Sequence, residues 1–292
     1  MVDVLKQSSI VSTETDVSRN SLEVSDKQKQ NDQYRVYTEG NSVAAFYYEN
    51  HIKQTYETVQ KKKKEILGKP KYKYSIMECA RKLNEVIDES DPDTNKSQIY
   101  HLIQTGERAR QLYPDLKWMH LVGFLHDLGK ILSHKDLFGE PQWCVVGDTF
   151  PVGCKFDEQN VHSKYFDENP DSSNPKYNTK LGVYTEHCGF DNVEFSWSHD
   201  EYMYQVLKRT GCTIPECGLY MIRYHSFYAW HTKQAYDHLA NEYDKDMLKY
   251  LHMFQICDLY SKVEEEIDIE KALPYYENLI KEFIPNDNEI MW

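Results

Sequence analysis

The stretch LVGFLHDLGK, residues 121–130, constrains this chain most, because it places three ionisable side chains within an apolar segment. A helix that is apolar on all sides is expected to be buried. His126, Asp127 and Lys130 would then lie inside the protein, where ionisable groups are costly unless they are paired, hydrogen-bonded or bound to metal. Spacings of three and four residues would place all three on neighbouring parts of one helix face.

This triplet alone allows two interpretations. A buried Asp127–Lys130 ion pair beside a core histidine is as consistent with it as a metal site, since His and Asp both bind metal ions of intermediate hardness. A second aspartate shifts the balance. The apolar stripe of a helix predicted over 244–262 continues into Asp258, which must also find a basic partner or a metal.

Composition limits the class of protein. The 292 residues carry a net charge of -13, which argues against nucleic acid and anionic membrane surfaces as partners. The seven cysteines form no CxxC pair and are odd in number, which favours free thiols in a reducing compartment. No signal peptide or membrane-spanning stretch is evident, so we expect a cytoplasmic protein.

The chain reads as one mostly α-helical domain. Polar residues dominate 1–32, which predicts a disordered N-terminal tail, and the domain is expected over 33–292. Helical periodicity is lost around 139–195, and long irregular segments of compact domains are often functional. Ser75 is expected to cap one helix, and a capping box of Ser198 and Glu201 is expected to start another.

Standard short metal and phosphate motifs are missing. There is no HExxH or ExxH pair, no GxGxxG loop and no Walker A loop. What remains is a dispersed set on successive helices: His101, the pair His126–Asp127, and Asp258. This order of H, HD and D resembles the HD-domain superfamily of metal-dependent phosphohydrolases.

The residues around these positions resemble a more particular family. HLIQTGE begins at 101, HLVGFLHDLGK at 120, EPQWCVVGDTFPVGC at 140, SWSHDEYMYQ at 196, YMIRYHSFYAWHT at 220 and DLYSK at 258. Together with YRVYTEG from 34 and DESDPD from 88, they are similar to myo-inositol oxygenase over roughly residues 33–292. The resemblance implies an oxygenase branch of the HD fold, a compact helical monomer with a non-haem di-iron centre.

Carried over motif by motif, the resemblance implies two irons bridged by Asp127. One iron would also bind His101, His126 and Asp258, and the other His199 and His225. Lys130 would donate to, or exchange a proton with, an iron-bound substrate oxygen, which makes Lys130 and Asp127 the predicted catalytic residues. The further substrate contacts implied are Arg35, Asp88, Glu89, Ser90, Gly147, Asp148, His225 and Ser226.

The implied activity is O2-dependent cleavage of the myo-inositol ring to D-glucuronate, with a mixed-valent Fe(II)/Fe(III) pair and O2 as co-substrate. Two alternatives stay open: a nucleotide phosphohydrolase of the HD type, and a non-enzymatic iron-binding protein. The phosphohydrolase should carry basic residues for phosphate, but around the HD pair only Lys130 lies on the buried face. The connection ILSHKDLFG after Lys130 is longer than expected for this family.

Overall fold

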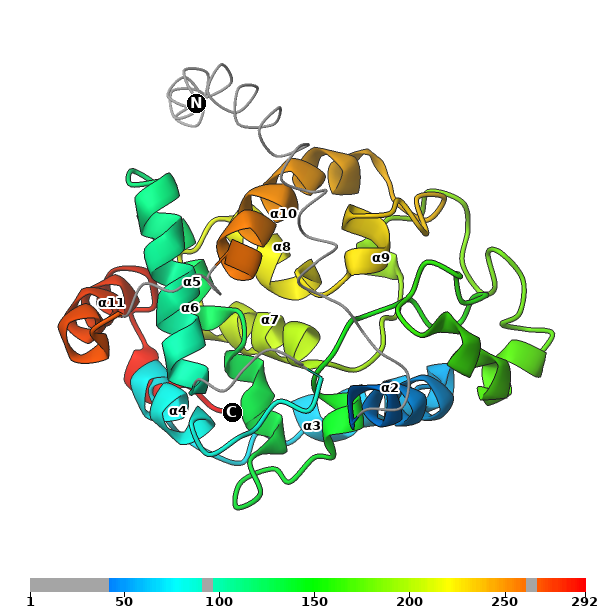
Figure 1. Ribbon diagram of the computed structural model, residues 1–292, viewed down its shortest axis with the longest axis horizontal. Helices are drawn as coiled ribbons and strands as arrows, with labels where there is room; N and C mark the ends of the chain where they lie inside the picture. The colour runs from blue at the N-terminus through cyan, green and yellow to red at the C-terminus, as the bar shows by residue number, and fades with distance from the viewer. Residues whose placement is uncertain (1–41, 91–96, 261–266) are drawn as a thin grey trace. The chain divides into compact units, whose positions relative to one another are not determined.

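The computed structural model describes residues 42–90, 97–260 and 267–292, drawn in colour in Figure 1. Its helices are α2 (Ser42–Lys53), α3 (Tyr56–Leu67), α4 (Ile76–Leu83), α5 (Gln98–Leu112), α6 (Lys117–Leu125), α7 (His199–Thr210), α8 (Glu216–Tyr224), α9 (Tyr228–His231), α10 (Glu242–Tyr260) and α11 (Ile269–Phe283). The mostly α prediction is confirmed. The predicted tail, 1–32, and the predicted substrate contact Arg35 lie outside the described residues.

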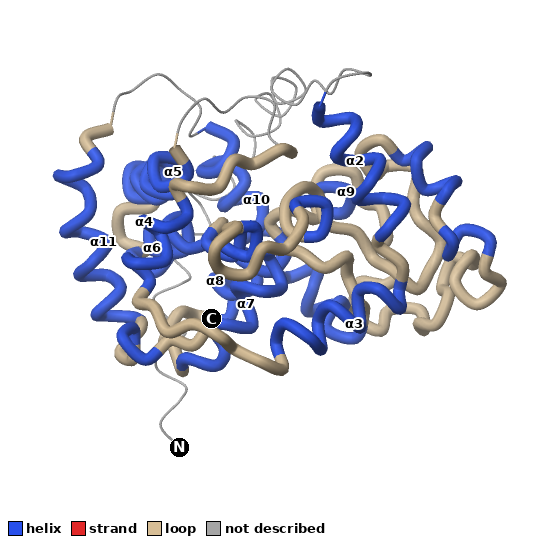
Figure 2. Tube along the Cα trace, turned by 90° about the horizontal axis from the view of Figure 1, so that it is seen from below, coloured by secondary structure: helices blue, strands red, loops and turns tan. Residues whose placement is uncertain are grey.

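Packed helix pairs form the centre of the fold. Helix α5 packs against α6 and α7 against α8, while α10 contacts both α5 and α8. Helix α11 covers α5 and α6 on the outer side, and the loops, drawn tan in Figure 2, gather toward α2 and α3. The helix ends that meet between these pairs carry the polar residues of the sequence motifs at 126–127, 199 and 225.

Helices α5 and α6 approach each other closely because small residues meet at their crossing. A Cβ atom on Gly123 of α6 would lie 2.7 Å from the backbone nitrogen of Gly106 on α5. Every residue from Met119 to Leu125 is buried, as the apolar pattern predicts. This contact fixes the C-terminal end of α6, and therefore the position of His126 that follows it.

The segment 121–130 is buried but is not one continuous α-helix, so that part of the prediction is wrong. Helix α6 ends at Leu125, and Asp127 has φ -97° and ψ -1° at the start of the 3₁₀ helix η2 (Leu128–Ser133). The tighter winding follows because η2 must pass the start of α7: a Cβ atom on Gly129 would lie 2.2 Å from the carbonyl oxygen of His199.

Capping residues were predicted for two helices, which the structure shows as α4 and α7. Ser75 forms a capping box with Glu78, which confirms its predicted role. The capping box of Ser198 and Glu201 is wrong: Ser198 is the N-cap residue, but its side chain makes no cap hydrogen bond. The Glu201 carboxylate instead accepts a hydrogen bond from Arg223 Nε at 2.7 Å, and a charged partner binds a carboxylate more strongly than a backbone amide does.

The irregular segment predicted around 139–195 is confirmed. It contains short 3₁₀ helices: η3 (Gln142–Cys144), η4 (Ser163–Glu168), η5 (Pro170–Ser173) and η6 (Phe190–Asn192). Buried contacts with α2 order it, for example the His51 ring stacked on Phe166 at 3.9 Å between centroids. Asn169 donates hydrogen bonds from its amide to the His51 and Gln54 carbonyl oxygens.

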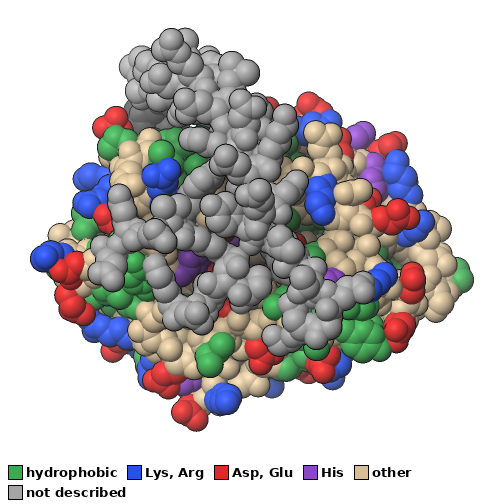
Figure 3. All heavy atoms as spheres, viewed as in Figure 1, with side chains coloured by type: hydrophobic (Ala, Val, Ile, Leu, Met, Phe, Trp, Pro, Cys, Tyr) green, Lys and Arg blue, Asp and Glu red, His purple; other side chains and the backbone are tan. Residues whose placement is uncertain are grey.

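Charged side chains of both signs are interspersed around the rim of the face shown in Figure 3. Among the described residues, no helix combines the length and the apolar character that crossing a bilayer requires.

We expect Gly123→Ala to destabilise the protein. Alanine is better than glycine in a helix by about 1 kcal/mol, but the added methyl would overlap the α5 backbone, and overpacking typically costs about 1–3 kcal/mol. Thermal unfolding should therefore show a lower midpoint than the wild type. Gly211→Ala is the reference variant. Gly211 has φ 66°, and a Cβ atom added there would meet nothing within 4 Å, so this substitution measures backbone strain without a clash. An unchanged or higher midpoint for Gly123→Ala would contradict the close crossing.

Candidate metal centre

The Asp127 carboxylate lies between two pairs of histidines. Its Oδ2 atom is 3.5 Å from His101 Nε2 and 3.4 Å from His126 Nε2. Its Oδ1 atom is 3.1 Å from His199 Nε2 and 3.6 Å from His225 Nε2. Each oxygen therefore faces one pair, which is the arrangement that a carboxylate bridging two metal ions requires.

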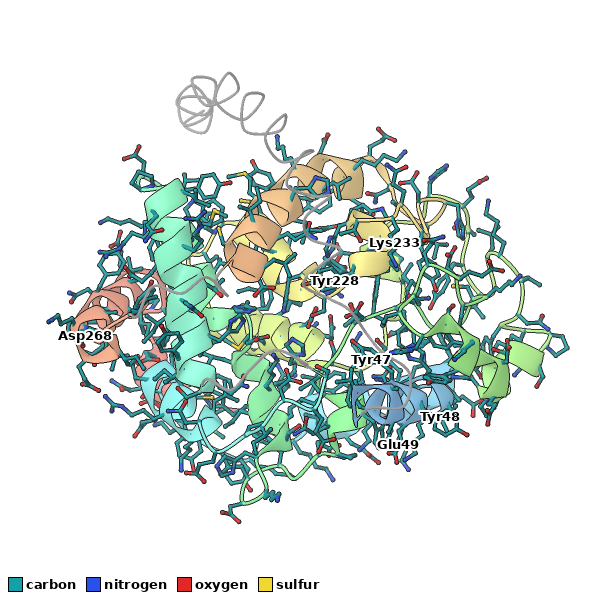
Figure 4. The ribbon with its side chains drawn as sticks, in the orientation of Figure 1. Tyr47, Tyr48, Glu49, Tyr228, Lys233 and Asp268 are labelled. Carbon is teal, nitrogen blue, oxygen red and sulfur yellow. The ribbon has the colours of Figure 1, made fainter. Side chains whose placement is uncertain are left out.

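A second carboxylate completes the first group. Asp258 Oδ1 lies 3.2 Å from His101 Nε2 and 3.5 Å from His126 Nε2. The Tyr228 hydroxyl at the start of α9, labelled in Figure 4, donates to Asp258 Oδ2 at 3.4 Å. The first group thus comes from α5, the end of α6 and α10, and the second from the start of α7 and the end of α8.

Backbone carbonyls fix the orientation of three histidine rings. His126 Nδ1 lies 2.8 Å from the Gly123 oxygen, His199 Nδ1 2.7 Å from the Val145 oxygen, and His225 Nδ1 2.9 Å from the Ile222 oxygen. Each Nδ1–H donates to its carbonyl, so each Nε2 atom presents a lone pair to the interior, as metal-binding histidines do.

The distance between two of these rings shows that a cation fits here. His199 Nε2 and His225 Nε2 are 3.3 Å apart. Two lone pairs at that distance repel each other unless a proton or a metal ion binds them. Four neutral imidazoles and two carboxylates form a donor set suited to first-row transition metals such as iron. The residues present therefore fit a metal centre of two adjacent ions.

The carboxylates control the charge of the histidines when no metal is bound. Burial opposes charge on the His126 ring, but Asp127 and Asp258 raise its pKa to about 10. Burial also opposes charge on His199, but Asp200 and Asp127 raise its pKa to about 9. Burial disfavours the Asp127 anion as well, yet the neighbouring cations hold its pKa well below the usual value.

Lys130 joins the metal centre to the segment that carries Asp88. Its Nζ atom lies 2.7 Å from Asp127 Oδ2 and 2.7 Å from Asp88 Oδ2. Asp88 Oδ1 in turn accepts hydrogen bonds from the Ser90 backbone at 2.8 Å and from the Ser90 hydroxyl at 2.6 Å. Burial opposes the ammonium charge of Lys130, but the two carboxylates raise its pKa, so it acts as a hydrogen-bond donor.

The Gly147–Asp148 turn packs against α2. Tyr47 donates from its hydroxyl to Asp148 Oδ1 at 3.1 Å and accepts from the Asp148 backbone nitrogen at 3.3 Å. Gly147 has φ 88°, and a Cβ atom there would lie 2.8 Å from the Phe46 ring. The Thr149 nitrogen donates to the Ser226 carbonyl oxygen at 2.9 Å, which ties this turn to the end of α8.

Gln142 anchors the backbone on either side of Asp88. Its Oε1 atom accepts a hydrogen bond from the Glu89 nitrogen at 2.9 Å, and its Nε2 atom donates to the Ile87 carbonyl oxygen. One side chain therefore pairs with the backbone on both sides of Asp88. The Glu89 side chain itself is exposed, so the structure connects this predicted contact to the site through its backbone.

Comparisons with known proteins agree with this geometry. A family model described as myo-inositol oxygenase matches residues 40–292. The chain belongs to the myo-inositol oxygenase family.

Named relatives in this family are similar over most of their length. The chain is 56% identical over 245 residues to "Probable inositol oxygenase" of Oryza sativa subsp. japonica, covering 84% of this chain and 79% of the relative. It is 53% identical over 257 residues to "Inositol oxygenase 2" of Arabidopsis thaliana, covering 86% and 81%. It is 44% identical over 261 residues to "Inositol oxygenase" of Mus musculus, covering 88% and 90%.

All six predicted metal ligands converge, although their binding of metal stays a prediction. Sequence reasoning did not single out Gln142, Tyr47, Tyr228 or Asp200. For Asp200 a signal was present, because His199–Asp200 repeats the HD dipeptide of 126–127.

Glu85, His134 and Asp136 form a third group of potential ligands, in which His134 is buried and both carboxylates are exposed. The His134 Nδ1 atom accepts the Asp136 backbone N–H at 3.3 Å, so only Nε2, which lies 3.2 Å from Glu85 Oε2, is left for another partner. The group is better explained as a His–Glu contact.

We expect metal uptake to compete with protons. The pKa values of about 10 for His126 and about 9 for His199 exceed the ordinary 6.5, so at neutral pH without metal both rings are positively charged, with a second proton on Nε2 in addition to the one on Nδ1. This protonation stabilises the metal-free protein fully below about 6.5, and the contribution is lost as pH rises through about 9 and 10. Anaerobic titration with Fe(II) should therefore release protons, and the apparent affinity should rise with pH. An affinity independent of pH would contradict the proposed ring states.

Proposed function

We propose that this protein is an inositol oxygenase that uses O2 to cleave the ring of myo-inositol and form D-glucuronate. The reaction is a four-electron oxidation in which one oxygen atom of O2 enters the product and the other leaves as water. The observation that carries the proposal is the position of Asp127 between two histidine pairs, in a chain that belongs to the myo-inositol oxygenase family.

We infer a centre of two iron ions with O2 as co-substrate. Asp127 would bridge the ions, with His101, His126 and Asp258 on one and His199 and His225 on the other. When bound, the iron pair in a mixed-valent Fe(II)/Fe(III) state supplies O2 activation and acidifies a coordinated hydroxyl. Asp127, His199 and His225 would give the second ion three protein ligands, which would leave more positions for substrate than on the first.

The residues around the centre suit a neutral ligand with several hydroxyl groups. Lys130 lies 2.7 Å from Asp127 and Asp88, so its ammonium group can also donate to a substrate oxygen next to the centre. The Asp88 and Asp148 carboxylates can accept from hydroxyls, while the Ser90 hydroxyl can bond a further one. Leaving such buried groups unpaired discriminates against polyols that lack a hydroxyl.

The phosphohydrolase alternative is not favoured. The family model that matches residues 40–292 is that of myo-inositol oxygenase, and the named relatives are inositol oxygenases.

We also infer that 33–292 form the catalytic domain and that the protein is a cytoplasmic monomer with no nucleic-acid or membrane partner. The seven cysteines are all free thiols, which supports a reducing compartment. The acidic net charge of -13 supports the absence of nucleic-acid binding.

The proposal is tested by supplying the purified protein anaerobically with Fe(II) and a reductant, adding myo-inositol and then admitting O2. We expect glucuronate to form with stoichiometric O2 uptake. Asp258→Ala should lower the iron content and turnover together, because two histidines of the first group lose their shared carboxylate partner. Phosphate release from nucleotides without O2 uptake, or full iron content in Asp258→Ala, would contradict the function or the ligand assignment, respectively.

Gln142 provides a graded test of the substrate segment. Gln142→Leu removes both backbone hydrogen bonds to Ile87 and Glu89, so we expect KM for myo-inositol to rise roughly tenfold while the iron content stays constant. Gln142→Glu keeps the acceptor for the Glu89 N–H and loses the donor, so its KM should be intermediate. Steady-state kinetics with iron analysis measures both, and unchanged KM values would show that the anchor is dispensable.

A further inference from the structure

Asp200 is a buried carboxylate beside the metal centre that has no role in the site as predicted from the sequence. It is the second residue of α7 and is 1% exposed. Its Oδ1 atom lies 2.9 Å from His199 Nε2 and accepts the Ser226 hydroxyl at 3.0 Å. Its Oδ2 atom accepts the Ser226 backbone N–H at 3.1 Å. Both oxygens of Asp200 therefore bind Ser226.

We propose that Asp200 is a positioning residue that turns the Ser226 hydroxyl into an obligatory hydrogen-bond acceptor for a substrate hydroxyl. A serine hydroxyl has a single proton and two lone pairs. Because that proton is donated to Asp200, the Ser226 oxygen can only accept toward the substrate. This inference rests on the proposed function, since it requires a polyol next to Ser226.

The contacts of Asp200 favour this direction. Its Oδ2 atom accepts the Ser226 backbone N–H at 3.1 Å and its Oδ1 atom lies 3.0 Å from the Ser226 hydroxyl, so both oxygens are held against donors of one residue. A carboxylate only accepts hydrogen bonds, so it fixes the hydroxyl proton of Ser226 on its own side.

The direction of the Ser226–Asp200 hydrogen bond matters because of where Ser226 lies. Ser226 follows His225, a predicted metal ligand, and its carbonyl oxygen accepts the Thr149 N–H next to Asp148. Asp200 therefore holds Ser226 from one side while the 147–149 turn holds it from the other. An acceptor fixed between them selects a ligand with a hydroxyl donor at that point, and a ketone or deoxy carbon there would leave it unpaired.

The competing interpretation is that Asp200 is itself a further metal ligand, through its Oδ1 atom. The two roles differ in what happens when the charge is removed. A ligand role predicts that Asp200→Asn loses iron, whereas a positioning role predicts full iron content with weaker binding of the polyol.

The experiment measures iron content and the anaerobic affinity for myo-inositol of the iron-loaded protein by calorimetry. Asp200→Asn keeps the volume of the side chain, but its amide cannot accept both Ser226 hydrogen bonds. We expect full iron content and roughly tenfold weaker binding. Ser226→Ala should weaken binding similarly, and the double variant should bind no more weakly than Ser226→Ala alone, because Asp200 acts through Ser226.

Asp244→Asn is the matched control. Asp244 is also buried, and it accepts the backbone N–H groups of Phe190 and Asn241 and the Tyr220 hydroxyl. It lies in the first turn of α10, roughly 20 Å along the helix from Asp258. Asp244→Asn should lower the thermal midpoint without changing iron content or affinity, which separates loss of a buried carboxylate from loss of the positioning role.

The outcomes are distinguishable. Loss of iron in Asp200→Asn overturns the positioning role in favour of a ligand role. Unchanged affinity, or additive losses in the double variant, also overturns it and leaves the proposed function intact. If the iron-loaded wild type itself neither binds nor oxidises myo-inositol, the proposed function fails, and the inference about Ser226 fails with it.

Discussion

The buried Asp127 carboxylate is the constraint on which the site depends. A buried charge is costly unless cations or hydrogen-bond donors surround it, and here His126 and Lys130 lie beside its Oδ2 atom and His199 beside its Oδ1 atom. These partners come from several helices, so the helix ends must meet at one point. The same convergence that compensates the charge brings together the side chains proposed to bind metal.

Helix ends, rather than helix middles, supply most of this chemistry. His126 and His225 follow the last residues of α6 and α8, and their Nδ1–H groups donate to carbonyls three residues earlier, Gly123 and Ile222. Those carbonyls belong to the last helical turn, which has no further backbone donors. Each ring therefore supplies a hydrogen-bond donor to a carbonyl at the helix end, and the same hydrogen bond orients the ring. One hydrogen bond thus fixes both the end of the helix and the direction of Nε2.

The sequence predicted the elements that depend on local pattern and missed those that depend on distant contacts. Burial of 121–130 followed from its apolar residues, and the ligand set followed from a family resemblance. The 3₁₀ winding after Asp127 did not, because it depends on the close contact of Gly129 with His199, far along the chain. The capping box at Ser198 failed for the same reason, since Arg223 binds the Glu201 carboxylate.

The side chains that sequence reasoning missed share a physical role. Each segment proposed to face the substrate is irregular backbone held by a polar side chain from another element: Gln142 holds 87–89, Tyr47 holds Asp148, and Asp200 holds Ser226. A neutral polyol brings no charge with which to organise such segments on binding. Its hydroxyls are distinguished only by the direction of hydrogen bonds, so donors and acceptors must be oriented beforehand. The polar residues around the candidate metal centre would therefore be as necessary for recognition of a polyol as the proposed ligands are for the metal.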